Sequence, residues 1–267
     1  MPFLSNLHTH SLYSDGGNAP EEYVQAAIER GFVSIGFSEH APGDECEIPE
    51  EKMPEYLAEI AALKQKYSGQ IEIYTGLELD YLATARAWRD SLDFTIGSVH
   101  SIPTIDGERL SVDYLPEHMA KLVCIYGSDG LVKEYYRLVR EVLKEKPNIV
   151  AHLDLIEKLN AENRFFNPVA RYYEQAAEET IAAISQAKLV VEVNTGAISR
   201  GYTTVPYPSK KLLQMLHSYK VPMTISSDAH SADTIDCAFD LALSLLREVG
   251  YKNVMLFRGG KFVEVAI

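Results

Sequence analysis

Short apolar runs of strand length alternate along the chain with longer segments that have a helical period. Strands are predicted at residues 3–7, 32–37, 70–77, 94–99, 148–151, 189–193 and 221–225. Between them, apolar residues that recur every three to four positions predict helices at residues 21–30, 50–67, 131–144, 168–186, 210–219 and 234–249. A terminal hairpin is expected at residues 254–265, with Gly259-Gly260 at its turn.

This alternation predicts an α/β fold with a parallel sheet. Polar residues able to bind a ligand follow nearly every strand, whereas an open sheet would concentrate its site at one switch point. We therefore expect the sheet to close into a barrel. At 267 residues, 46% of them hydrophobic, the chain can form this barrel as one domain, residues 1–267.

Composition narrows the class of partner. The net charge of -13 disfavours nucleic acid, because binding by counterion release needs clusters of Lys and Arg that the sequence lacks. The longest apolar stretches are strand-sized, and the first residues lead directly into a polar segment, so we expect a soluble, cytoplasmic protein without a membrane segment. Cys46, Cys124 and Cys237 are scattered and form no C-x-x-C pair, which predicts reduced and mostly structural thiols.

Candidate metal ligands occur at the carboxyl ends of the predicted strands. His8 and His10 can reach the same ion because alternate side chains of a strand share a face. The nine candidate metal ligands at or near the strand ends are His8, His10, Asp15, His40, Glu78, His100, His152, Asp228 and His230. Imidazole and carboxylate without thiolate favour Zn, Mn or Fe. Nine ligands exceed the four to six or so that one ion takes, so two or three ions are implied.

Several of these segments carry motifs of a known family. They are His8-Thr9-His10-Ser-Leu-Tyr-Ser-Asp15-Gly, Ile35-Gly-Phe-Ser-Glu-His40-Ala-Pro, Gly76-Leu-Glu78, Gly97-Ser-Val-His100, Ala151-His152-Leu-Asp-Leu and Ser227-Asp228-Ala-His230. Together they resemble the PHP (polymerase and histidinol phosphatase) superfamily over nearly the whole chain. The segment 37–42, the residues before Glu78, and Arg200 followed by Tyr207-Pro-Ser look most like the histidinol-phosphate phosphatases of that superfamily.

The resemblance implies a distorted (β/α)7 barrel with three divalent ions. By that resemblance, the first ion would take His8, His10, Glu78 and Asp228. Glu78 would bridge to a second ion that is also bound by His100 and His152, and Asp15, His40 and His230 would bind the third. A hydroxide shared by the first two ions would attack phosphorus. Asp228 or His230 could assist proton transfer to the leaving group, although water is an equally good candidate.

Residues near the strand ends are candidates for substrate contact. Arg200 follows the sixth strand, Arg164 follows the fifth by a short loop, and both are candidate phosphate ligands. Asn194 is expected to line the pocket, and Glu192 is either a ligand or a polar residue satisfied inside the barrel. The acids that could pair with the amino or imidazole group of histidinol are Glu39, Asp44, Glu45, Asp154 and Glu157.

The leading hypothesis is hydrolysis of L-histidinol phosphate to L-histidinol and phosphate, a step of histidine biosynthesis. A PHP phosphoesterase acting on phosphotyrosine or another small phosphate would share the same metal chemistry. An amidohydrolase-type enzyme also begins with H-x-H, but its bridging lysine would replace Glu78. A non-catalytic PHP domain of a DNA polymerase would be expected in a longer chain with basic surfaces. The oligomeric state is left open.

Overall fold

Seven parallel strands form one sheet in the computed structural model of the protein, which describes residues 4–43, 46–81, 83 and 87–267. In sheet order the strands are β1 (Leu4–Asn6), β2 (Phe32–His40), β3 (Glu72–Leu79), β4 (Phe94–Gly97), β7 (Ile149–Val150), β8 (Val190–Asn194) and β9 (Met223–Ser226). A parallel bridge between Thr9 and Ala229 joins the segments beyond β1 and β9. The sheet is thus nearly closed, and the predicted (β/α)7 barrel is confirmed.

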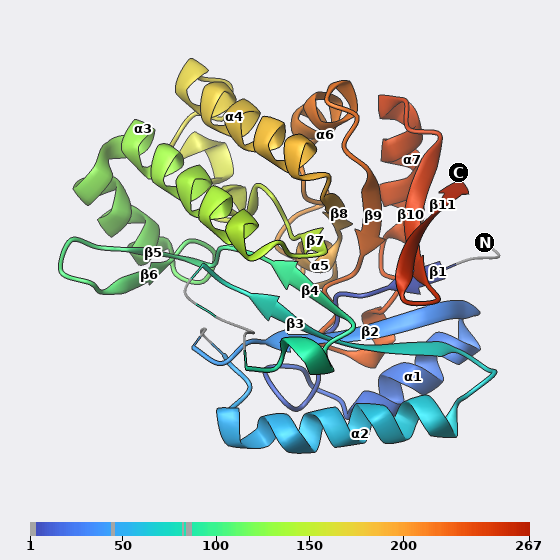
Figure 1. Cartoon of the computed structure of the whole chain (residues 1–267). Coiled ribbons are helices and arrows are strands. Elements are labelled where there is room, and N and C mark those ends of the chain that lie inside the picture. Colours follow the sequence, from blue (N-terminus) through green and yellow to red (C-terminus); the bar gives the residue numbers. More distant parts are fainter. Residues whose placement is uncertain (1–3, 44–45, 82, 84–86) are drawn as a thin grey trace.

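Helices cover the outside of the barrel (Figure 1). They are α1 (Pro20–Glu29), α2 (Met53–Lys66), α3 (Pro116–Val142), α4 (Arg171–Ala187), α6 (Lys210–Ser218) and α7 (Phe239–Val249). The short helix α5 (Gly196–Ser199) instead follows β8 at the carboxyl end of the barrel, where Gly196 lies against Asp228. Short 3-10 turns are η1 (Glu50–Lys52), η2 (Arg89–Ser91), η3 (Leu143–Glu145), η4 (Leu155–Glu157), η5 (Ala161–Asn163) and η6 (Ala232–Thr234). All six predicted helices are present, because their apolar faces pack against the strands or against neighbouring helices.

Four helix starts differ from the prediction by three residues or more. Helix α2 begins at Met53 instead of residue 50, after the turn η1. Helix α3 begins at Pro116 instead of residue 131, and Gly127 interrupts it with a φ of 67°. The segment Gly127-Ser-Asp-Gly130 resembles a helix breaker in sequence. The chain is nevertheless helical both before and after Gly127. Helices α4 and α7 begin three and five residues later than predicted, at Arg171 and Phe239. Residue 3 of the first predicted strand lies outside the described residues.

A second hairpin, β5 (Ser101–Pro103) with β6 (Arg109–Ser111), was not predicted. It extends from the barrel directly after His100 (Figure 1). The backbone N–H of Val112 donates to the carbonyl of His100 over 2.8 Å, so the chain returns to the point from which the hairpin left. The Asp106-Gly107 dipeptide is the turn signal that could have indicated it.

The barrel interior is filled by apolar side chains and closed at its amino end by the terminal hairpin, β10 (Asn253–Arg258) and β11 (Lys261–Ala266), as predicted. The ring of Phe94 lies so close to Gly36 and Gly76 that a Cβ there would approach it to 2.8 Å and 2.4 Å. Phe257 enters the same cluster and meets Tyr74 edge to face, with ring centroids 4.7 Å apart. The hairpin therefore completes the core.

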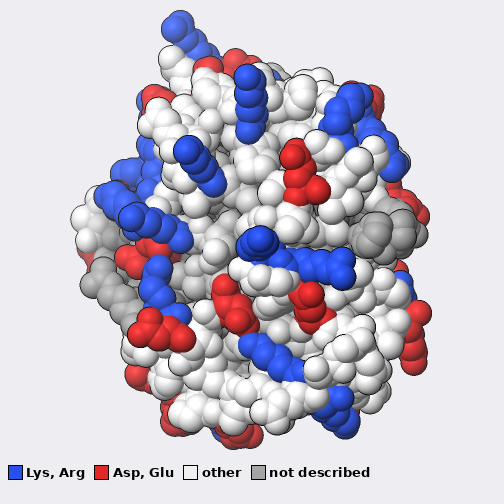
Figure 2. Space-filling view, turned by 45° about the vertical axis from the view of Figure 1, so that its right-hand side comes forward, with Lys and Arg blue, Asp and Glu red and all other residues white. Residues whose placement is uncertain are grey.

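The charge distribution, the hydrophobicity of the helices and the cysteines all bear on the composition-based expectations. Lys and Arg are interspersed with Asp, Glu and uncharged residues on the face shown in Figure 2. None of the described helices is long and apolar enough to cross a membrane. No disulfide joins the three cysteines, of which Cys46 and Cys124 are exposed and Cys237 is half-buried. The exposure of Cys46 and Cys124 does not favour the prediction that the thiols are mostly structural.

Replacing Phe257 with alanine should destabilise the fold, because it removes a buried ring from the end of the barrel. We expect a loss of about 3–5 kcal/mol in the free energy of unfolding, measured by urea denaturation. Ile105→Ala is the control, since Ile105 is 89% exposed in the β5–β6 turn and should change stability by less than about 0.5 kcal/mol. Equal stability of the two variants would show that the hairpin does not complete the core.

Candidate metal centre

All nine predicted metal ligands lie together at the carboxyl ends of the barrel strands. They come from segments that are far apart in the sequence and that only the closed sheet brings together: His8, His10 and Asp15 after β1, His40 and Glu78 within β2 and β3, His100 after β4, His152 after β7, and Asp228 and His230 after β9. Parallel strands place all of these ends at the same mouth of the barrel.

Four donor atoms surround one point at the centre of this mouth. His8 Nε2 lies 3.2 Å from Glu78 Oε2 and 3.6 Å from Asp228 Oδ1, and His10 Nε2 lies 3.4 Å from both oxygens. A tetrahedral ion with bonds of about 2.0–2.2 Å would hold its ligands about 3.3–3.6 Å apart. The four distances from imidazole nitrogen to carboxylate oxygen therefore match the spacing of a tetrahedral metal site.

The second oxygen of Glu78 faces two further histidines. Glu78 Oε1 lies 3.1 Å from His152 Nε2 and 3.4 Å from His100 Nε2. The carboxylate thus has one oxygen toward His8 and His10 and the other toward His100 and His152. A carboxylate in this position is suited to bridge two ions.

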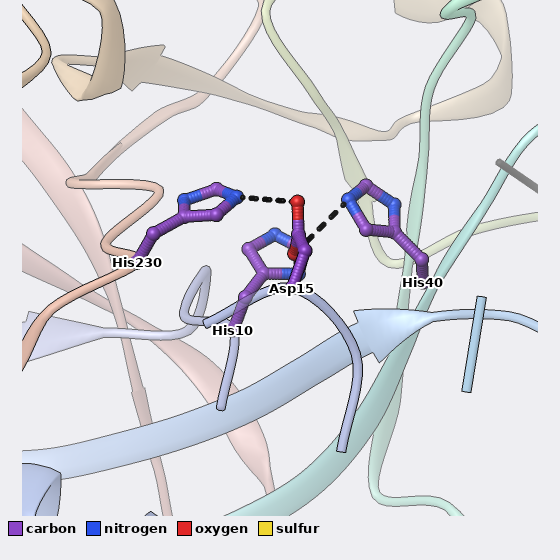
Figure 3. A group of neighbouring side chains, drawn as sticks. All are labelled: His10, Asp15, His40 and His230. Atoms are coloured by element: carbon purple, nitrogen blue, oxygen red, sulfur yellow. Dashed lines mark hydrogen bonds and ion pairs between the residues drawn. The ribbon is translucent and has the colours of Figure 1, made fainter. Parts of the chain in front are cut away.

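A third group of donors surrounds Asp15 at the edge of the mouth (Figure 3). Asp15 Oδ2 lies 3.1 Å from His230 Nε2, and Asp15 Oδ1 lies 3.7 Å from His40 Nε2. The imidazole of His10 stacks between those of His40 and His230, with centroid distances of 4.4 Å and 4.6 Å. His10 therefore connects the first and third groups.

Buried imidazole nitrogens without hydrogen-bond partners support metal binding. Nε2 of His8 and both ring nitrogens of His10 are buried and form no hydrogen bond with the described residues. Unpaired buried polar atoms are rare in native proteins because their desolvation is not compensated. An ion coordinated by these nitrogens would remove that cost.

A buried carboxylate behind the centre orients His8. Both oxygens of Glu192 lie 3.0–3.1 Å from His8 Nδ1, so Nε2 of the ring points to the centre. Glu192 also accepts hydrogen bonds from the backbone N–H of His152 and from the amide of Asn194. The interpretation of Glu192 as a polar residue satisfied inside the barrel fits these contacts. The expectation that Asn194 lines the pocket is corrected. Its side chain donates to Glu192 and accepts from the Gly196 N–H, and it does not line the cavity.

The charges of the centre stabilise one another. Burial lowers the pKa of His10, but Asp228, Glu78 and Asp15 outweigh it and raise the pKa to about 9. Burial raises the pKa of Glu78, yet the surrounding histidines hold it well below its usual range. The pKa of Asp228 is likewise lowered, against burial, by Arg200 and by His8, His10 and His230. The carboxylates are therefore ionised, as metal ligands must be.

Arg200 lies against Asp228 and His230. Its guanidinium donates to Asp228 Oδ2 and to the Asp228 carbonyl, each over 3.1 Å, and lies 2.8 Å from His230 Nδ1. Asp228 has a φ of 48°, a left-handed conformation that is costly for a residue with a side chain. Gly196 gives the site room, since a Cβ there would lie 2.8 Å from Asp228 and 3.0 Å from Arg200.

A cavity of about 450 Å³ opens above the centre. Its walls include most of the predicted ligands together with Arg200, but not Arg164, which is exposed and lies over the ring of Phe165. The prediction that Arg164 reaches the site is therefore not supported by its position. Asp113 and Lys158, which were not among the predicted site residues, also line the cavity and pair over 2.9 Å.

The acids expected to reach an amino or imidazole group lie elsewhere. Glu39 accepts hydrogen bonds from Ser11, the Asp154 carboxylate accepts from Ser209 N–H, and Glu157 pairs with a tyrosine. None of these three lines the cavity among the described residues. Asp44 and Glu45 lie outside the described residues.

Glu192→Gln tests whether this carboxylate orients His8. The amide keeps the size of the side chain but loses the charge that holds His8 Nδ1–H, so we expect metal affinity to fall about 10- to 100-fold. Competition with a chelator measures it. The control is Glu264→Gln, an exposed residue of β11. Unchanged affinity in a Glu192→Gln protein that melts at the normal temperature would contradict the orienting role.

The chain is similar in sequence and in fold to known proteins. A histidinol-phosphatase of Bacillus subtilis is 28% identical over 89% of this chain and 97% of its own length. A crystal structure from Listeria monocytogenes, assigned to the histidinol phosphatases, shares the fold with a TM-score of 0.79 at 22% identity, over 89% of this chain and 99% of that one. A Lactococcus lactis histidinol phosphate phosphatase, solved with Zn, L-histidinol and phosphate, has a TM-score of 0.71 at 24% identity, over 97% and 98% of the two chains. The model of the PHP domain family matches residues 6–196, and the chain belongs to that family.

Proposed function

We propose that this protein is a phosphoric monoester hydrolase that converts L-histidinol phosphate to L-histidinol and phosphate. The proposal is carried by the position of Glu78 at the floor of a cavity that also contains Arg200. One oxygen of Glu78 faces His8, His10 and His40, and the other faces His100 and His152. The relatives named as histidinol phosphatases match along nearly their whole length and support the choice of substrate.

The donor groups suggest three divalent ions, of Zn, Mn or Fe. The first would be bound by His8, His10, Glu78 and Asp228. Glu78, His100 and His152 would bind the second, and Asp15, His40 and His230 the third. The distances of the Glu78, Asp228 and Asp15 oxygens from these histidine nitrogens, and the unpaired nitrogens of His8 and His10, support this assignment. When bound, such ions supply Lewis acidity and lower the pKa of a water nucleophile toward neutrality.

The protein's own side chains would bind the phosphate of the ester and help to transfer the proton. Arg200 is held against Asp228 at the cavity wall, where its guanidinium can bind the anionic oxygens of the phosphate and offset charge that develops in the transition state. The leaving alkoxide would take its proton from His230 or from water, because Arg200 and the neighbouring histidines hold Asp228 ionised. Hydrolysis follows because the cavity holds phosphate, nucleophile and proton donor together.

A substrate panel tests the proposal directly. We expect kcat/KM for phosphate release from L-histidinol phosphate to exceed that from phosphotyrosine and p-nitrophenyl phosphate by about 100-fold or more, since substrate groups beyond the phosphate contribute to transition-state binding. The enzyme is loaded with Mn or Zn before assay. Comparable or faster release from phosphotyrosine would refute the assignment to L-histidinol phosphate and favour another PHP phosphoesterase.

Arg200→Ala should lower kcat/KM for every phosphate ester by about 100-fold, because one charge-assisted contact to the phosphate is lost. Arg164→Ala is the matched control and should leave kcat/KM within about twofold, since Arg164 lies outside the cavity. Metal content of both variants is measured by mass spectrometry, because Arg200 also contacts Asp228. Normal turnover in the Arg200 variant would remove it from the site, and a loss caused by Arg164→Ala would restore that residue as a candidate.

A further inference from the structure

We propose that Asp113 binds the primary ammonium group of the substrate and thereby selects amino-alcohol phosphates over other phosphate esters. This inference rests on the proposed function, because it concerns the second end of the same substrate. Neither the family motifs nor the predicted ligand set includes this residue.

The β5–β6 hairpin places Asp113 in the cavity wall. The chain leaves the barrel after His100, turns at Gly107 and returns at Val112, whose N–H donates to the His100 carbonyl over 2.8 Å. His118 fixes the returning strand, because its Nδ1 accepts the N–H of Ser111 over 3.2 Å. Asp113 is therefore held beside the metal ligands without contributing to them.

Asp113 is the cavity carboxylate that the metal centre does not use. Asp15, Glu78 and Asp228 also line the described part of the cavity, but each of them contacts histidine nitrogens within a donor group. Burial raises the pKa of Asp113, but Lys158 outweighs it and the pKa lies below its usual range. The side chain thus presents a negative charge, and an ammonium group needs such a partner when it leaves water.

The carboxylate is the more accessible member of its ion pair. Its Oδ2 accepts from Lys158 Nζ and its Oδ1 from the Ser111 hydroxyl, each over 2.9 Å. The Lys158 side chain is only 8% exposed, whereas that of Asp113 is 20% exposed. The ring of Tyr202 also covers the Lys158 ammonium, with 4.6 Å from Nζ to the centroid. Since a carboxylate offers about four acceptor positions, Asp113 can accept further donors from the cavity.

The charges of the cavity match the two ends of the proposed substrate. The phosphate dianion belongs at the metal centre and Arg200, and the ammonium group lies two carbon atoms from the ester oxygen. Lys158 holds Asp113 in place as a positioning residue. An ester without the amine would leave the Asp113 acceptor positions unused and would gain nothing from this contact.

The test compares L-histidinol phosphate with 3-(imidazol-4-yl)propyl phosphate, which lacks only the amine. Asp113→Asn should lower kcat/KM for the amino ester about 10- to 100-fold, mainly through KM, because a hydrogen bond to a charged group is lost. The deamino ester should change by less than about twofold. Asp113→Glu keeps the charge and should recover part of the loss. Asp129→Asn is the matched control, since Asp129 forms an exposed pair with Lys133 over 2.8 Å on α3.

Three outcomes would overturn the inference. An equal loss for both imidazolyl esters would mean that Asp113 only supports the structure. An unchanged preference for the amino ester in Asp113→Asn would show that another group binds the amine, and the proposed function would stand. A wild-type enzyme that hydrolyses p-nitrophenyl phosphate but not L-histidinol phosphate would refute both proposals.

Product binding to the wild-type protein provides a measurement that does not depend on the folding of a variant. L-Histidinol should inhibit hydrolysis of p-nitrophenyl phosphate about 10- to 100-fold more strongly than 3-(imidazol-4-yl)propanol, which lacks the amine. Equal inhibition by the two alcohols would contradict amine recognition by this cavity. Melting temperatures of the three Asp113 and Asp129 variants identify any loss that comes from unfolding.

Discussion

The buried carboxylate of Glu78 is the constraint on which the rest of the site depends. It is 1% exposed and lies within 3.4 Å of five imidazoles, two on one oxygen and three on the other. A carboxylate at this depth is strongly disfavoured as an ion unless positive charge surrounds it. The strands that carry the five histidines must therefore end at the same level, and closure of the sheet accomplishes this.

The two ends of the barrel differ in composition and in role: the amino end is apolar and closed, and the carboxyl end carries the ligands. At the amino end, glycines make room for Phe94, and the terminal hairpin inserts Phe257 as a final apolar layer. At the carboxyl end, polar groups replace the apolar layer, and Glu192 and the backbone hold them in place. The rigid apolar end fixes the strand positions, so that ligands from distant segments meet within a few ångströms.

Local charge inside the cavity differs from the charge of the whole molecule. The protein carries a net charge of -13, yet Arg200 and Lys158 lie in the cavity walls and divalent ions would add further positive charge. A phosphate ester can therefore bind in an acidic protein. Asp113 introduces one negative position at the side of this cavity, and this asymmetry is what a substrate with a phosphate at one end and an ammonium group at the other requires.

The sequence by itself determined the strand and helix alternation, the seven-stranded barrel and the candidate ligands, because apolar periodicity and the residues at strand ends are local properties. The dipeptide Asp106-Gly107 is a local signal for the β5–β6 turn as well. The tertiary structure alone decided which residues face the cavity. Arg164 and Arg200 both follow strands, yet only Arg200 turns inward, and Asn194 is held by Glu192. Asp113 and Lys158 lie 45 residues apart and form a pair only because the hairpin returns to His100. No local pattern encodes such a contact, since it depends on how the segments pack.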